Sequence, residues 1–165
     1  MKFLHRYGYY EIRCRLNRQP GWWVAFWLQS PSVGAHPDPR RAGIECDIME
    51  SQEYPQDKTI RCGNIWNGYG KNCCGSGHKH PSICDTPDGW HYFGVDWSRN
   101  GYVFYADGTA VNRVADPVSE TEQFILVSTE PMGYRETSAK ANPLLDQVVF
   151  PEYFEVDFVR VFDEQ

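Results

Sequence analysis

Short segments rich in valine, isoleucine, tyrosine, phenylalanine and tryptophan recur along the chain, separated by glycine, proline, asparagine and aspartate. The first group favours β-strands and the second breaks them, and no segment keeps a 3.6-residue apolar period over three helical turns. An all-β fold is therefore expected, with turns at residues 97–101 and 106–109. The expected strands cover residues 7–16, 22–29, 44–51, 60–66, 91–97, 102–106, 109–114, 123–129 and 154–162.

The 165 residues fit a single domain over residues 1–165, because no linker, repeat or low-complexity tract divides them. Evenly spaced strands with glycine-rich turns predict a jelly-roll sandwich, in which two antiparallel sheets bury their apolar faces against each other. Two strands show the alternation that such sheets need. The first places Tyr10, Ile12, Cys14 and Leu16 on one face, and the last groups Phe154, Val156, Phe158 and Arg160.

Composition excludes several kinds of partner. Sixteen basic and 22 acidic residues give a net charge of −6, which argues against nucleic acid. No apolar run approaches the roughly 20 residues of a membrane-spanning helix, and a monomer is expected. Aromatic residues, by contrast, make up 15% of the chain, more than a core of this size requires. Rings in excess of the core are suited to stacking against a ligand.

Four of the six cysteines cluster between residues 62 and 84, in a segment rich in glycine, asparagine, serine and proline. No Cys-x-x-Cys pair occurs, which argues against a zinc ribbon. We expect a disulfide-linked loop over residues 72–87, which would indicate an oxidising compartment; four free thiols are the alternative. The two remaining cysteines, Cys14 and Cys46, are expected to be small buried apolar residues.

The most informative segment is residues 43–51, where three carboxylates interrupt an otherwise apolar strand. Glu45 and Asp47 are two residues apart and share a face. Glu50 is five residues from Glu45, which would place it on the opposite face of a regular strand. One extra residue, a β-bulge near Met49, would return Glu50 to the face of the other two carboxylates.

Such a bulged strand can carry out glycoside hydrolysis. Four regular steps give about 13 Å between the Cα atoms of the two glutamates. Side chains leaning toward each other can then reach the roughly 5–5.5 Å carboxyl separation of a retaining glycoside hydrolase. One glutamate would attack the anomeric carbon and the other would exchange the proton, while Asp47 would help to keep that proton in the cluster. A solvated acidic strand face or a calcium site is the alternative.

Residues 45–50, Glu-Cys-Asp-Ile-Met-Glu, resemble the Glu-x-Asp-x-x-Glu signature of glycoside hydrolase family 16. The likeness covers nearly the whole chain, and residues 21–28 resemble the family segment Gly-x-Trp-Pro-Ala-Phe-Trp-Leu, with Val24 in place of proline. Other stretches similar to family strands are residues 7–13, 90–97, 103–108 and 154–161.

The resemblance implies a β-jelly roll with a concave substrate cleft and retention of configuration. It implies that Glu45 is the nucleophile, Asp47 the assisting acid and Glu50 the acid/base. The longer Glu-x-Asp-x-x-Glu form is similar to that of laminarinases, agarases, carrageenases and porphyranases. The resemblance therefore implies a secreted endo-acting hydrolase of a β-1,3-glucan, or else of a β-galactan. It implies no required cofactor.

Family domains carry additional strands before the segment that begins at Tyr7. The resemblance therefore implies that N-terminal strands, part of the cleft wall and the signal peptide lie outside this chain. Family members often bind a structural calcium ion through N-terminal groups and an aspartate of the closing strand. Asp157 matches that aspartate and is the candidate calcium ligand.

Several other residues are candidates for binding sugar. Trp23 and Trp27 share a face of their expected strand and are candidate stacking platforms, with burial in the core as the alternative. The remaining candidate substrate-binding residues are Trp66 and Tyr69 in a loop-like stretch, His91 at a strand start and Glu130 at a strand end.

Two other functions fit the same sequence. A jelly roll can bind a glycan without cleaving it, because the fold does not determine the function. A transglycosylase would form the same covalent intermediate and pass it to a sugar in place of water. The first would release no reducing ends, and the second would lengthen chains.

Overall fold

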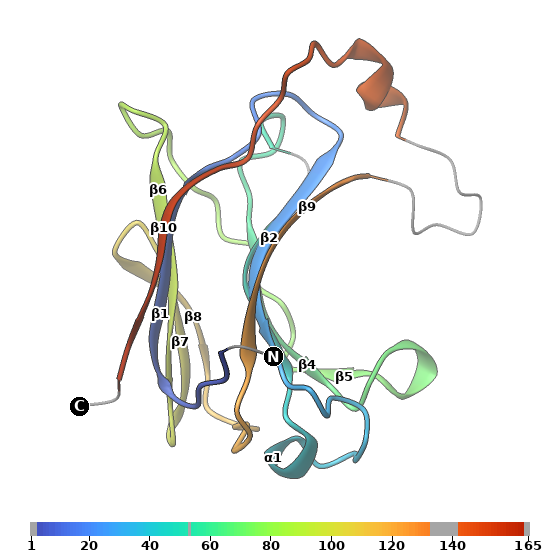
Figure 1. The fold of residues 1–165 in the computed structure, drawn as a ribbon, viewed down its shortest axis with the longest axis vertical. Helices are drawn as coiled ribbons and strands as arrows, with labels where there is room; N and C mark the ends of the chain where they lie inside the picture. The colour runs from blue at the N-terminus through green and yellow to red at the C-terminus, as the bar shows by residue number, and fades with distance from the viewer. Residues whose placement is uncertain (1–2, 53, 133–141, 164–165) are drawn as a thin grey trace.

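A computed structural model of the chain describes residues 3–52, 54–132 and 142–163. Two five-stranded antiparallel sheets face each other across the core, which confirms the expected all-β sandwich (Figure 1). One sheet has the order β10-β1-β6-β7-β8 and the other the order β5-β4-β3-β2-β9. The strands are β1 (Gly8–Arg15), β2 (Trp22–Gln29), β3 (Glu45–Ser51), β4 (Arg61–Trp66), β5 (Cys74–Gly75), β6 (His91–Ser98), β7 (Gly101–Ala106), β8 (Thr109–Val114), β9 (Phe124–Pro131) and β10 (Glu155–Phe162).

The helical segments are short and lie between strands. Helix α1 (Pro39–Ala42) is capped by Asp38, whose side chain accepts a hydrogen bond from the Arg40 amide at 3.0 Å. Two 3₁₀ turns, Gly70–Asn72 and Pro143–Gln147, lie in the longer connections. Among the residues that the structure describes, no helix has the length and apolar character needed to cross a membrane.

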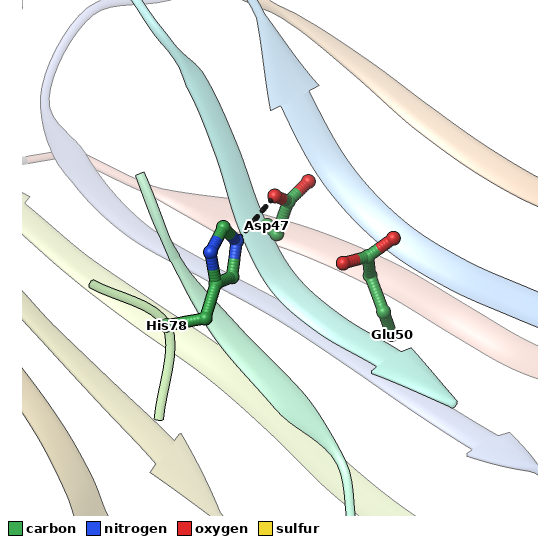
Figure 2. A group of neighbouring side chains, drawn as sticks. All are labelled: Asp47, Glu50 and His78. Carbon is green, nitrogen blue, oxygen red and sulfur yellow. Dashed lines mark hydrogen bonds and ion pairs between the residues drawn. The ribbon is translucent and has the colours of Figure 1, made fainter. Parts of the chain in front are cut away.

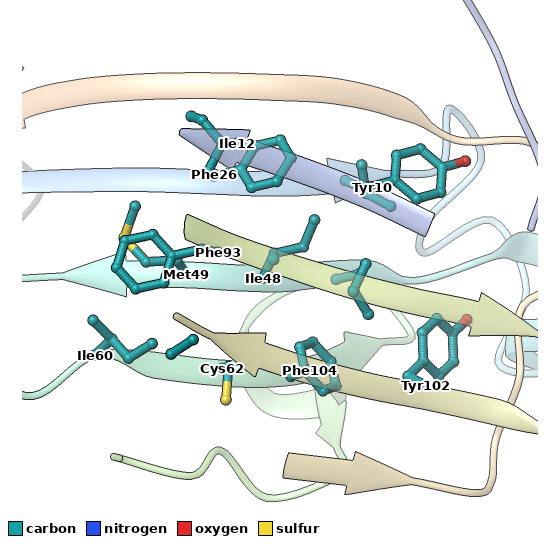
Figure 3. Packing of buried hydrophobic residues seen from close by; sticks show 14 of the residues in the cluster. Tyr10, Ile12, Phe26, Ile48, Met49, Ile60, Cys62, Phe93, Tyr102 and Phe104 are labelled. Atoms are coloured by element: carbon teal, nitrogen blue, oxygen red, sulfur yellow. The ribbon is translucent and has the colours of Figure 1, made fainter. Parts of the chain in front are cut away.

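The core fills the space between the inner faces of the two sheets. Tyr10 and Ile12 of β1 face Phe26 of β2, and aromatic rings of β6 and β7 extend the layer (Figure 3). Trp97 stacks on Tyr102 with ring centroids 5.9 Å apart. Each such buried side chain contributes about 1.5–3 kcal/mol through its removal from water. Cys14 and Cys46 lie in this core, as expected.

Strand β3 contains the predicted bulge. Phe26 pairs with Met49 and Trp27 pairs with Asp47, so that Ile48 is the extra residue opposite β2. Ile48 and Met49 are both fully buried in the core. Because two successive side chains point inward, the alternation restarts one residue later and the next side chain points outward.

The last strand differs from its expected alternation. A second irregularity, between Arg13 and Cys14 of β1, leaves Asp157 as the extra residue of β10. Beyond it the two faces exchange: Phe158 lies on the outer face opposite Arg13, while Val159 and Val161 pack against the core. The grouping of Phe158 and Arg160 with Phe154 and Val156 was therefore wrong, because the bulge reverses the pattern midway through the strand.

The expected disulfide-linked loop is also corrected. All six cysteines are free thiols, and Cys62 is fully buried among apolar residues, where burial raises its pKa to about 12. Residues 79–82 are instead held by backbone hydrogen bonds to the start of β4. The backbone N–H of Cys62 donates to the Lys79 carbonyl at 3.1 Å, and the Cys62 carbonyl accepts from the Lys79 amide at 3.0 Å. Antiparallel pairing thus fixes this loop without a covalent bond.

Candidate active site

A cleft of about 410 Å³ lies on the outer face of the sheet that contains β3. Its floor is formed by β2, β3 and β4, and side chains from β9 and from the connection after β4 complete its walls. The lining residues are Trp23, Ala25, Trp27, Glu45, Asp47, Glu50, Arg61, Ile65, Tyr69, His78, Ser128 and Glu130.

The three carboxylates of β3 share this cleft because of the bulge. Figure 2 shows the Asp47 and Glu50 side chains projecting from the same side of the strand. Asp47 is 5% exposed and Glu50 is 7% exposed, whereas Glu45 is only partly buried. Two carboxylates that are nearly withdrawn from water cannot both carry a full charge at low cost.

Glu45 is held by two hydrogen-bond donors. The Gln29 amide donates to its Oε2 atom at 2.9 Å, and the Tyr69 hydroxyl donates to the same oxygen. Burial and this bond raise the pKa of Tyr69, so the phenol keeps its proton. Glu45 therefore receives hydrogen bonds at neutral pH, as an ionised carboxylate does.

Glu50 is placed to carry a proton. Burial and, to a smaller extent, the nearby charge of Asp47 raise its pKa to about 7, although Arg61, His78 and a hydrogen bond from Trp23 oppose the rise. The Trp23 indole donates to Glu50 Oε1 at 2.9 Å. A carboxyl group with a pKa near 7 can both donate and accept a proton at neutral pH.

His78 joins the carboxylates from the segment after β5. Its Nε2 atom lies 2.9 Å from Oδ2 of Asp47 (Figure 2). Gly63 of β4 leaves room for this approach, because a Cβ atom there would lie 3.2 Å from the His78 Cα. The sequence pattern did not indicate His78, since only the pairing of residues 79–82 with β4 brings it to the cleft.

Most of the predicted sugar-binding residues line the cleft. Trp23 and Trp27 lie on β2, and the Trp27 indole donates to Ser128 Oγ at 3.2 Å. Tyr69 is 61% exposed, and Glu130 of β9 pairs in register with Trp23. The structure thus brings these four side chains together with the carboxylates, as the sequence predicted.

Trp66 and His91 do not lie among the residues that line the cleft. Trp66 packs against the hydrophobic core, since residues of β4 alternate and Arg61 and Ile65 take the cleft face. His91 belongs to the other sheet, is 1% exposed, and bonds Asp107 through Nδ1 at 2.9 Å. This hydrogen bond joins the β7–β8 turn to β6.

Three side chains in the cleft have the spacing of a metal site. Donor atoms of Asp47, Glu50 and His78 all lie within 4.8 Å of one another. The Asp47–His78 hydrogen bond already joins two of those atoms, so an ion would have to displace it. The candidate calcium ligand Asp157 instead accepts a hydrogen bond from the Arg13 guanidinium at 2.7 Å. A cationic neighbour at that distance does not fit a calcium site, and calcium binding stays a prediction.

A β-sandwich with neighbouring carboxylates in an aromatic cleft is the architecture of a jelly-roll glycoside hydrolase. Residues 2–142 match the model of glycosyl hydrolases family 16, and the chain belongs to this family.

The chain also resembles individual proteins. It is 26% identical over 162 residues to endo-1,3-1,4-beta-glycanase EglC of Rhizobium meliloti (strain 1021), covering 97% of this chain and 31% of that protein. It is 30% identical to endo-1,3-1,4-beta-glycanase ExsH of the same organism over 117 residues, or 70% of this chain and 22% of that protein. The laminarinase catalytic domain of Thermotoga petrophila RKU-1 has the same fold, with a TM-score of 0.75 at 23% identity over 99% of this chain and 66% of that one. The chain therefore spans about a third or less of the curated relatives.

Proposed function

We propose that the protein is a secreted, retaining endo-β-glucanase that hydrolyses a β-1,3-glucan of the laminarin type. The observation that carries this proposal is the cleft that holds Glu45, Asp47 and Glu50 on one face, with the pKa of Glu50 raised to about 7. The laminarinase and endo-1,3-1,4-beta-glycanase names of similar proteins support a β-glucan substrate.

In the first step, Glu45 attacks the anomeric carbon while Glu50 protonates the departing glycosidic oxygen. The bond to the leaving sugar breaks as the ester to Glu45 forms. Gln29 and Tyr69 orient the Glu45 carboxylate for this attack. Trp23 holds Glu50 through its indole N–H, and with Trp27 it offers the rings on which sugar residues stack.

In the second step, ionised Glu50 removes a proton from water while the water oxygen attacks the anomeric carbon. The bond from that carbon to Glu45 breaks, which releases the sugar and restores Glu45 as a carboxylate and Glu50 as an acid. The new charge on Glu50 faces Asp47, which is unfavourable. Arg61 and His78 lower that cost, and His78 binds the Asp47 oxygen directly. These neighbours therefore allow Glu50 to lose its proton and regain it during the reaction.

A reducing-end assay on laminarin, lichenan, agarose, porphyran and carrageenan tests the proposal. We expect short oligosaccharides from laminarin or lichenan, with retained anomeric configuration by NMR, and no turnover by Glu45→Gln. Hydrolysis of a galactan alone would contradict the glucan assignment. Binding without release of reducing ends would indicate a glycan-binding protein, and chain lengthening would indicate a transglycosylase.

A further inference from the structure

A second, smaller cavity adjoins the cleft beyond Glu50. Its volume is about 250 Å³, and Glu50 and Arg61 line both spaces. Because Glu50 is the proposed proton donor, a sugar on the leaving-group side of the scissile bond would extend toward this cavity. The remaining lining residues are Gln52, Asp57, Thr59 and His80.

Arg61 lines both spaces and acts on Glu50 through its charge, without a hydrogen bond between the two side chains. It lies directly opposite Glu50 in the β3–β4 register, yet the Glu50 carboxyl bonds to Trp23. Within the described part of the chain, Arg61 makes no ion pair, and its buried Nε atom has no hydrogen-bond partner. A buried N–H without an acceptor is a desolvation cost, so the structure keeps this guanidinium beside Glu50 at some expense.

The other groups around the cavity suit an anion better than a cation. Gln52 and His80 can donate hydrogen bonds into it. Asp57, the exposed carboxylate of the set, accepts from the Thr59 amide at 2.9 Å and belongs to that turn. Guanidinium binds planar or tetrahedral oxyanions through two parallel hydrogen bonds, and this geometry is stronger and more selective than binding to neutral hydroxyls.

We propose that Arg61, with Gln52 and His80, forms a subsite on the leaving-group side that binds an anionic substituent of the glucan, either a carboxylate or a sulfate ester. This inference rests on the proposed β-glucanase function and narrows its substrate to an acidic β-glucan. The subsite explains why a positive charge is placed beside the proton donor. An anion bound there neutralises Arg61 and so favours the protonated form of Glu50 during the first step.

Three matched polymers test the subsite: laminarin, laminarin oxidised at C6 to carboxylates, and laminarin sulfated to the same degree. We expect kcat/KM to be roughly tenfold or more higher on one of the charged polymers, with the advantage reduced by salt. The polymer that shows the advantage identifies the substituent. Equal rates on all three polymers would overturn the proposal.

Substitution then locates the effect. Arg61→Gln should lower kcat/KM on the preferred charged polymer by roughly tenfold to a hundredfold, and by a much smaller factor on laminarin. Arg61→Lys should restore part of the loss. Arg113→Gln, an exposed arginine of β8 remote from the cleft, is the matched control for charge. An equal loss of kcat/KM on all three polymers would contradict the subsite and would show that Arg61 contributes only to hydrolysis of the glucan backbone.

Two further readouts keep the outcome decisive. Thermal unfolding shows whether Arg61→Gln is folded. If the variant is unfolded, the proposal is decided by the preference of the unaltered protein for a charged polymer over laminarin and by the salt dependence of that preference. If no β-glucan is hydrolysed, the proposed function fails by itself. In that case, affinity electrophoresis of the Glu45→Gln protein in the three polymers still decides the subsite, with charge-selective retardation supporting it and equal migration excluding it.

Discussion

Strands β1 and β3 both carry charged residues on the face turned away from the core, but they place them in opposite surroundings. On β1, Arg13 pairs with Asp157 at 2.7 Å and Arg15 pairs with Glu155 at 3.4 Å, near water. On β3, carboxylates lie near one another and two of them are almost fully buried. The exposed ion pairs of β1 contribute little to the stability of the fold. The neighbouring buried carboxylates of β3 lower its stability, and such groups are typical of functional sites.

The largest effect should come from removing the proposed proton donor. Glu50→Gln should lower kcat on laminarin by roughly 10²–10⁴-fold, because general acid catalysis contributes about that much. An aryl β-glucoside with a good leaving group needs no proton and should lose far less in the first step. Burst kinetics on the two substrates check this difference. Equal losses would show that Glu50 does not protonate the leaving oxygen.

The next effect concerns pH and stability. Burial raises the pKa of Glu50 to about 7 from an ordinary value of 4.5, so between these values the folded chain holds a proton that the unfolded chain has lost. The resulting stabilisation is complete below about pH 4.5 and is lost as pH rises through 7, by about 3 kcal/mol in all. Urea unfolding of the parent and of Glu50→Gln over this window measures it. The variant should lack this slope, and parallel curves would contradict the buried-carboxyl interpretation.

The smallest effect is expected on the paired face. Glu155→Gln breaks an exposed ion pair with Arg15 and should change the free energy of unfolding by at most about 1 kcal/mol. The difference should shrink in high salt, and activity should not change. A loss comparable to that of a buried residue would show that the two faces are more alike than their burial indicates.

Local sequence pattern was sufficient for the bulge of β3 and for every described strand except β5, a two-residue strand in a segment that was expected to be a loop. The five-residue separation of Glu45 and Glu50 cannot be reconciled with a regular strand if both are used together, and the structure places the extra residue at Ile48. In β10 the bulge at Asp157 has no such signal, because no functional residue lies on both sides of it. The predicted alternation of β10 is consequently wrong for the residues after Asp157.

The cleft was predicted less completely than the strands. Trp23, Trp27 and the carboxylates lie on strands whose facing residues follow from a period of two. His78 and His80 reach the site through pairing of residues 79–82 with β4, which is a long-range arrangement without a local pattern. Gln29 and Arg61 were likewise missed, because a single polar residue on a strand does not reveal what lies across from it.

Gly63 couples strand β4 to the segment that carries His78. A Cβ atom there would lie 3.2 Å from the His78 Cα, so a substitution must displace the backbone that carries the imidazole by a few tenths of an ångström. A side chain at Gly63 therefore acts on the catalytic cleft at a distance, because it shifts the imidazole that binds Asp47.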